Sequence, residues 1–186
     1  MTTSVSMRWG GDQPTLGDGV VEVRPWRGDD AQWVWGACQD PDIQRWANVP
    51  VPYELTDAET FVGVYAPSKW QNEDGAHFAV VDATTGDLLG CVGMDIVDTR
   101  SAVAEAGYWT SLPARGTGVT TRALHLLSDW AAESVGVVRL ELLIEAENSR
   151  SRALAERAGF HCEGVMVKRS WRAGAHRDVA LYARTN

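Results

Sequence analysis

Two glycines stand where a strand-like run of the chain gives way to a helix-like run, in residues 114–124. Pro113 ends the upstream run, and apolar residues recur downstream at helical spacing. A helix that starts near Thr117 directs its unpaired backbone N–H groups and its positive dipole end at the loop. Gly116 and Gly118 leave no Cβ between the backbone and an anion. The segment therefore predicts a phosphate cradle, although a plain strand-to-helix turn has the same pattern.

A second block, residues 147–160, predicts a short helix with defined ends. Asn148 stands where an N-cap is expected, and Ser151 follows in the first turn. Gly159 occupies the C′ position at which glycine commonly ends a helix, and Phe160 leads into the next strand-like run. By itself this block is an ordinary capped helix.

Alternating and apolar runs predict strands between the helices. Residues 84–87 form the turn between two of these strands. A mixed order of strands and helices, with antiparallel hairpins toward both ends, indicates an α+β arrangement. The expected strands are residues 20–24, 77–82, 88–97, 102–111, 138–145, 160–171 and 177–183.

The spacing Arg-x-x-Gly-x-small over residues 115–120 and the Asn-x-x-Ser helix ending in Gly-Phe together resemble the GNAT N-acetyltransferase superfamily. Residues 23–26, 40–42 and 177–182 resemble its RimJ/RimL-like branch, so the likeness covers roughly Val20 to Ala183. The resemblance implies a GNAT-like α+β domain with a mixed, mostly antiparallel central sheet flanked by helices. It also implies direct transfer of an acetyl group from acetyl-CoA to a primary amine.

The resemblance assigns the acetyl-CoA contacts to three segments. The end of the strand before the loop binds the pantetheine arm through its main chain, where one N–H faces the thioester oxygen. Such a donor contributes about 3 kcal/mol in comparable sites. The glycine loop binds the pyrophosphate, although Thr120 stands where the family usually has Gly or Ala. The expected cofactor-binding residues are Trp109, Thr110, Ser111, Arg115, Gly116, Thr117, Gly118, Val119, Thr120, Asn148 and Ser151.

Two side chains are the candidates for proton transfer. Glu105 precedes the cofactor loop on a strand on which several GNAT enzymes have a glutamate that acts as base through water. A carboxylate on the wet face of a sheet gives the same pattern. Many family members use a tyrosine on the Asn-x-x-Ser helix as acid, but that position is Ala155 here. RimJ/RimL-like members are expected to use the serine instead, which makes Ser151 the candidate acid.

The acceptor is an amine whose identity stays open between a protein N-terminus and a small molecule. Trp46, Tyr53 and Trp70 are the expected substrate-binding residues, because they lie beside loops in the half that forms the acceptor cleft in the family. The acyl group is open between acetyl and a longer chain. The alternative function is a catalytically inactive module that binds and senses acyl-CoA, and the missing tyrosine and Thr120 leave room for it.

Composition excludes several other classes of protein. The chain has 186 residues and a net charge of −8 without a basic cluster, which argues against nucleic-acid binding. No apolar run approaches the ~20 residues of a membrane span. The three cysteines and four histidines are scattered, so no metal site is expected and a reduced, cytoplasmic compartment is favoured.

The composition of the first 19 residues predicts a domain boundary near residue 20. Residues 1–19 are rich in Thr, Ser, Gly and Asp and lack the apolar segment of a signal peptide, so we expect a flexible tail. Residues 20–186 form the acetyltransferase domain. Val165, Val167 and Trp171 in the C-terminal hairpin are a candidate contact for a homodimer, and the oligomeric state stays open.

Overall fold

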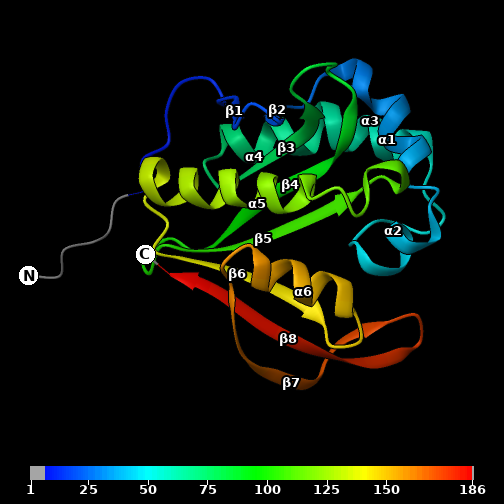
Figure 1. The fold of residues 1–186 in the computed structure, drawn as a ribbon, viewed down its shortest axis with the longest axis vertical. Helices are drawn as coiled ribbons and strands as arrows, with labels where there is room; N and C mark the ends of the chain where they lie inside the picture. The colour runs from blue at the N-terminus through cyan, green and yellow to red at the C-terminus, as the bar shows by residue number, and fades with distance from the viewer. Residues whose placement is uncertain (1–6, 186) are drawn as a thin grey trace, which may run out of the picture.

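The computed structural model describes residues 7–185 and contains one eight-stranded sheet in the order β1-β2-β3-β4-β5-β6-β8-β7 (Figure 1). The strands are β1 Leu16–Gly17, β2 Val21–Pro25, β3 Gly75–Asp82, β4 Leu88–Asp98, β5 Val103–Thr110, β6 Arg139–Glu145, β7 His161–Arg172 and β8 Ala175–Thr185. The helices are α1 Ala31–Ala37, α2 Pro41–Trp46, α3 Leu55–Thr60, α4 Ala66–Gln71, α5 Val119–Trp130 and α6 Ser149–Arg157.

Shorter helical turns extend or introduce these helices. A π-helical turn over Phe61–Tyr65 joins α3 to α4, and another over Ala131–Val135 continues α5. One turn of 3-10 helix, Gly28–Asp30, precedes α1. Another, Leu112–Ala114, precedes the glycine loop.

Helices cover both faces of the sheet. Helices α5 and α6 lie against the face that is turned to the viewer in Figure 1, where they bury Leu124, Leu127 and Ala155 in the larger core. Helices α1 to α3 pack on the opposite face, in a second core that contains Val34 and Val62. The sheet residues alternate between these two cores, as strand geometry requires.

Neighbouring strands are antiparallel with one exception. Strands β3, β4 and β5 form the expected meander, and the turn after β3 contains Gly86 with a φ of 77°. Strands β7 and β8 form the C-terminal hairpin, and β8 pairs with β6. Among the described residues, only β5 and β6 run parallel. This parallel pair joins the meander to the part of the sheet that contains the hairpin.

Close contact between β4 and β5 depends on Gly90. A Cβ placed on Gly90 would meet the carbonyl oxygen of Trp109 more closely than real side chains approach. Glycine at this position therefore lets β4 hold the end of β5 at its normal ladder distance.

A buried ion pair attaches α1 to the sheet. Both terminal nitrogens of the Arg24 guanidinium donate to Asp30, over 2.8 and 2.9 Å, and the two residues are 6% and 5% exposed. Burial opposes ionisation of Asp30, but hydrogen bonds from Arg24 and from the backbone of Arg27 outweigh it and hold its pKa below the usual range. The start of α1, the first helix on this face, is therefore held against β2.

The expected flexible tail over residues 1–19 is wrong for residues 7–19. The backbone N–H of Arg8 donates to the carbonyl of Val135 over 2.7 Å, and Leu16 pairs with Val23 in the sheet. Trp9 packs edge-to-face on Trp70 and Trp130, with ring centroids 5.3 and 6.4 Å apart. The polar composition predicted a tail because a single, partly buried tryptophan carries no periodic signal. Residues 1–6 lie outside the described residues.

We expect Trp9→Ala to lower the free energy of unfolding by about 2 kcal/mol, because it removes a half-buried ring from a well-packed aromatic cluster. Urea denaturation followed by tryptophan fluorescence and circular dichroism measures the change. Leu112→Ala is the control, because Leu112 is 65% exposed, and its change should stay within about 0.5 kcal/mol. Equal effects of the two substitutions would show that Trp9 does not belong to the core.

Candidate active site

Strands β5 and β6 separate after three residues of pairing. Val103 to Glu105 pair with Arg139 to Glu141. Beyond these residues β5 follows β4 to Thr110, whereas β6 follows β8 to Glu145, and no further register pair joins β5 to β6 in the described chain. The edge of β5 that faces β6 therefore presents peptide groups to a gap.

The glycine loop and α5 lie at the end of this gap. Gly116 and Gly118 have φ angles of 79° and 86°, which a side chain would strain, and Gly118 is the N-cap of α5. The hydroxyl of Thr117 donates to the carbonyl of Ala114 over 2.7 Å and braces the turn. The helix begins at Val119, two residues after the expected start. Its first backbone N–H groups therefore face the loop, in the arrangement that binds anions.

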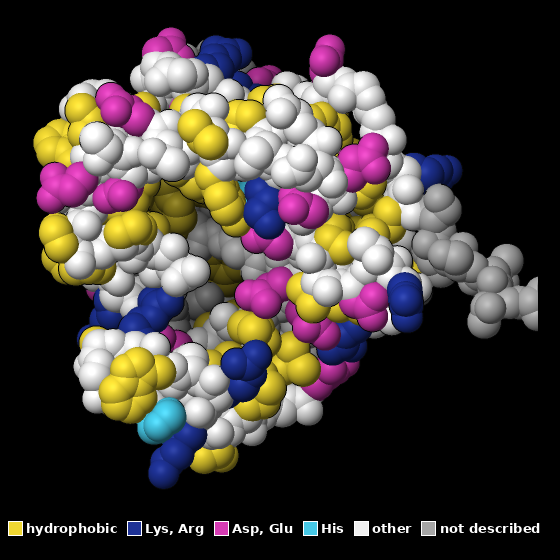
Figure 2. Space-filling view, turned by 180° about the vertical axis from the view of Figure 1, so that it is seen from behind, with side chains coloured by type: hydrophobic (Ala, Val, Ile, Leu, Met, Phe, Trp, Pro, Cys, Tyr) yellow, Lys and Arg dark blue, Asp and Glu magenta, His cyan; other side chains and the backbone are white. Residues whose placement is uncertain are grey.

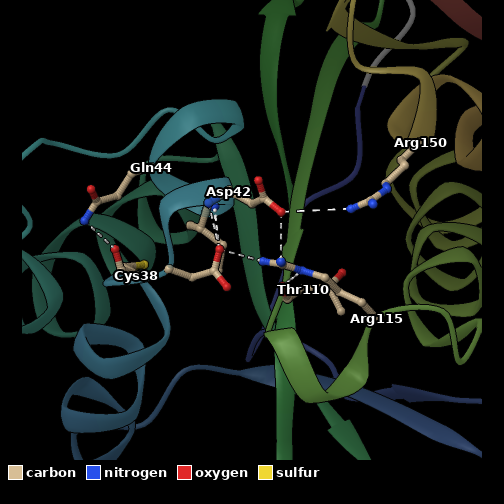
Figure 3. Close-up of polar contacts among 8 residues, drawn as sticks. Cys38, Asp42, Gln44, Thr110, Arg115 and Arg150 are labelled. Atoms are coloured by element: carbon tan, nitrogen blue, oxygen red, sulfur yellow. Dashed lines mark hydrogen bonds and ion pairs between the residues drawn. The ribbon is translucent and has the colours of Figure 1, made fainter.

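Arg115 does not offer the loop a free positive charge. Its guanidinium lies 3.0 Å from Asp40 and 3.2 Å from Asp42, at the start of α2, and its Nε donates to the Thr110 carbonyl over 3.3 Å (Figure 3). Arg150 approaches the same Asp42 carboxylate at 4.0 Å. Arg115 therefore fastens α2 to the loop, a contact 73 residues apart in sequence that no local pattern predicts.

Helix α6 presents its first turn to the same gap. The Asn148 side chain accepts a hydrogen bond from the backbone N–H of Ser151 over 3.1 Å, which is the expected N-cap. The Ser151 hydroxyl lies 2.8 Å from the hydroxyl of Tyr108 on β5. Sequence reasoning did not identify Tyr108 as a site residue.

A cavity of about 900 Å³ crosses the gap from Ser151 to the opposite face of the sheet. Figure 2 shows a hollow on that face, with apolar walls and with acidic and basic side chains at its edge. The polar and charged lining residues include Asp57, His77, Asp95, Glu105, Glu145, Asn148, Ser151, Arg169 and Arg172, and the aromatic ones include Trp46, Tyr53, Phe61, Tyr65, Tyr108, Trp109 and Trp171.

Comparison with known proteins decides the family. The model of the acetyltransferase (GNAT) domain matches residues 21–161. The chain belongs to the GNAT acetyltransferase family.

Individual relatives agree with this assignment. YdaF of Bacillus subtilis, provisionally named a ribosomal N-acetyltransferase, is 32% identical over 98 residues, which is 53% of this chain and 54% of that protein. The chain therefore aligns with about half the length of that relative. The uncharacterized N-acetyltransferase p20 of Bacillus licheniformis is 22% identical over 83% of this chain and 86% of its own.

Solved structures share the fold. The ribosomal L7/L12 α-N-protein acetyltransferase RimL, in complex with coenzyme A, superposes with a TM-score of 0.84 at 18% identity, over 92% of this chain and 98% of its own. Mycobacterium smegmatis RimJ, with a coenzyme A disulfide, gives 0.81 at 24% identity, over 92% and 87%. The expected family, the α+β fold with its mostly antiparallel sheet and the N-acetyltransferase class are confirmed.

The GNAT domain brings most of the expected cofactor residues together. Trp109 and Thr110 end β5 beside the gap, Ser111 follows the strand, and the loop residues come after the 3-10 turn at Leu112–Ala114. The Thr120 hydroxyl bonds to that of Thr110, and Thr120 is only 8% exposed. Thr120 therefore packs between α5 and β5. The Thr120 side chain, which is larger than the Gly or Ala usual in the family, contacts Thr110 on the strand and does not extend into the loop.

The expected acceptor residues divide between two faces. Trp46 and Tyr53 line the cavity. The assignment of Trp70 to the acceptor site is wrong, because its ring packs on Trp9 and Trp130 with the larger core. Its position near a loop gave no information on which face of the sheet the ring would reach.

Glu105 lies in the cavity on the face opposite to α5 and α6. Burial by the cavity walls, and then the charges of Asp95 and Glu141, raise the pKa of its carboxyl above the ordinary glutamate value. Asp95 is directly opposite Glu105 in the β4–β5 register. It remains ionised because His77 and Lys69 each lie 3.2 Å from its carboxylate. A carboxyl with a raised pKa suits a base that works near neutral pH.

Two features, a metal-ion cluster and a membrane-spanning helix, are absent from the part of the chain that is described. Residues 7–185 contain no group of three or more His, Cys, Asp or Glu side chains placed to hold a metal ion. Within the same residues, every helix is too short or too polar to cross a membrane.

We expect Gly118→Ala to weaken acetyl-CoA binding about tenfold, because the added methyl group lies where the loop would receive phosphate and the φ of 86° becomes strained. Isothermal titration calorimetry measures the dissociation constant. Gly159→Ala is the matched control, because Gly159 has a φ of 81° and equally open surroundings at the far end of α6. Both substitutions should lower stability by about 1 kcal/mol, and only the first should affect binding. Unchanged binding in Gly118→Ala would mean that the loop is a structural turn.

Proposed function

We propose that the protein acetylates the N-terminal α-amine of a peptide or protein, with acetyl-CoA as the acetyl donor. The observation that carries the proposal is the cavity that crosses the gap between β5 and β6 and has Ser151 at one end and Glu105 on the other face. A donor held on the α5–α6 side and an acceptor entering from the opposite face would meet between a candidate acid and a candidate base.

The residues present fit acetyl-CoA as the donor. The edge of β5 beyond Glu105 is not paired with β6 and offers peptide groups to the amides of a pantetheine arm, in the manner of an added strand. The N-terminus of α5 and the glycine loop suit a pyrophosphate. Arg115 would contribute by holding the loop in place.

Two proton transfers complete the reaction. Glu105 accepts a proton from the attacking amine, directly or through water, as the C–N bond forms. Ser151 donates its proton to sulfur as the C–S bond breaks and sulfur keeps the electron pair. Solvent in the cavity restores both groups, so the products are the amide and the free thiol.

An α-amine suits this site better than a lysine side chain does. An α-amino group with a pKa of about 7.7–8.0 is partly neutral at pH 7.4, whereas a lysine amine near 10.4 costs about 4 kcal/mol to deprotonate there. A single carboxylate with a raised pKa is a sufficient base for the first amine and a weak one for the second. The names of several structural neighbours, RimL among them, refer to ribosomal proteins as substrates.

A small cationic amine is the second candidate acceptor. Asp95, Glu105 and Glu145 give the cavity acidic groups, and Trp46 and Trp109 give it aromatic faces, a combination that binds ammonium ions. A spermidine N-acetyltransferase and a microcin immunity acetyltransferase are among the structural neighbours. Binding of acetyl-CoA without turnover of any amine would favour the acyl-CoA-sensing alternative.

We propose the cytoplasm as the compartment and β7 as the contact of a homodimer. Three free cysteines, two of them buried, suit a reducing compartment in which acetyl-CoA is available. Strand β7 is at the edge of the sheet, and Val167 and Trp171 on it are 72% and 65% exposed. Long exposed edge strands are commonly covered by another chain.

The acceptor class is tested by release of free thiol from acetyl-CoA in the presence of hexapeptides that begin with Ala, Ser or an acetylated Ala, and of spermidine. We expect turnover of at least one peptide with a free α-amine and none of the blocked peptide, with mass spectrometry placing the acetyl group on the terminal nitrogen. Turnover of spermidine alone would replace the peptide proposal by the small-amine candidate.

The base is tested by the pH dependence of kcat/KM. The pKa of Glu105 is raised above the usual value near 4.3, so the active carboxylate is present above that raised pKa and is lost as the pH falls through it. The α-amine itself gives kcat/KM an acidic limb near its own pKa of about 7.7–8.0, so we expect only the second limb, at lower pH, to disappear in Glu105→Gln, with kcat/KM lowered about 100-fold at neutral pH. Asp57→Asn, at another acidic position in the cavity lining, should keep that second limb. An unchanged profile in Glu105→Gln would remove Glu105 as the base.

A further inference from the structure

Tyr108 reaches Ser151 from the separated part of β5. Alternation along the strand places Tyr108 on the α6 side of the sheet, whereas Glu105 and Trp109 face the acceptor side. The Tyr108 hydroxyl oxygen lies 2.8 Å from Ser151 Oγ and 3.3 Å from the Ser151 carbonyl oxygen. Helix α6 contains no tyrosine, and the phenol at the gap comes from β5.

The Tyr108 hydroxyl has a single hydrogen, and the geometry indicates which oxygen accepts it. A separation of 2.8 Å is typical of a strong O–H···O bond, whereas 3.3 Å is long for one. The Ser151 carbonyl is also inside α6, where main-chain carbonyls already accept helical N–H groups. Burial raises the pKa of Tyr108 to about 12, so the phenol keeps its hydrogen at neutral pH. Tyr108 is therefore the donor and Ser151 Oγ the acceptor.

This direction leaves the hydrogen of Ser151 for another partner. The backbone N–H of Ser151 is already held by Asn148, and its Oγ lone pair is directed at Tyr108. The remaining Oγ–H then points away from the phenol. Both Tyr108 and Ser151 line the cavity that crosses the gap, so a sulfur atom in that gap is in a position to receive the hydrogen.

We propose that Tyr108 is a positioning residue that orients the Ser151 hydroxyl for protonation of the leaving sulfur. The inference rests on the proposed role of Ser151 as the acid. As the C–S bond breaks with its electron pair on sulfur, Ser151 supplies the proton, and the hydrogen bond from Tyr108 stabilises the charge left on Oγ until water restores the proton. Tyr108 itself neither gains nor loses a proton.

The test is Tyr108→Phe, which keeps the ring and removes only the hydroxyl. Single-turnover rates with excess enzyme report the chemical step, so slow product release cannot hide the effect. The reaction is acetylation of the hexapeptide that is turned over, or hydrolysis of acetyl-CoA, which releases the same thiol. We expect the rate to fall about tenfold, and the acetyl-CoA dissociation constant to change by less than about twofold.

Tyr182→Phe is the matched control. Its hydroxyl also contacts α6, through Arg152 and Glu156, but not Ser151, and the ring is fully buried. We expect its single-turnover rate to match that of the unaltered protein. Equal losses in Tyr108→Phe and Tyr182→Phe would mean that both hydroxyls only hold α6, and the inference would fail.

A double substitution separates this inference from the proposed function. Ser151→Ala alone should lower the single-turnover rate about 100-fold, and adding Tyr108→Phe should then change it by less than about twofold, because the group that Tyr108 orients is gone. A full rate in Ser151→Ala would overturn the acid assignment and this inference with it. A slow Ser151→Ala with a full rate in Tyr108→Phe would overturn this inference alone.

Discussion

The separation of β5 from β6 is the constraint on which the rest of the site depends. Parallel strands in the middle of a sheet normally satisfy each other's peptide groups, and leaving such groups unpaired costs free energy. Here β4 holds one strand and β8 holds the other, so the two diverge after Glu105 while each keeps a full ladder on its outer side. A substrate that carries amide groups can complete the ladder that the protein leaves open. The pairing of β5 with β4 and of β6 with β8 thus creates a gap that can serve as a binding site.

The same gap explains how groups on opposite faces of a sheet can serve one reaction. Successive side chains of β5 alternate, so Glu105 faces the acceptor side while Tyr108 faces α6. In a closed sheet, the backbone layer would separate them. Because the strands have parted, the cavity passes between them and reaches both groups. The proposed base and the proposed acid would then act on the two sides of one carbonyl.

Local patterns predicted the parts of the site that depend on local backbone geometry. The glycine loop, the N-cap at Asn148 and the alternation of β6 each depend on residues within one element, and the sequence identified them. The roles of Arg115 and Trp70 depend on partners far along the chain, and they were assigned incompletely or wrongly. Tyr108 was missed for the same reason, because alternation separates it from Trp109 but does not say that Ser151 lies opposite, 43 residues away.

The acceptor side is held by a different kind of contact from the cofactor side. Helix α2 has only six residues, and polar contacts fasten both of its ends: Arg115 binds Asp40 and Asp42, and Arg172 from the hairpin donates to the carbonyls of Arg45 and Ala47. The cofactor side instead packs α5 and α6 on a continuous apolar core. Changes in α2 or in the hairpin tip can therefore reshape the acceptor cavity while the loop, the gap and the core remain. This division explains why the reaction can be inferred from the chain with more detail than the acceptor can.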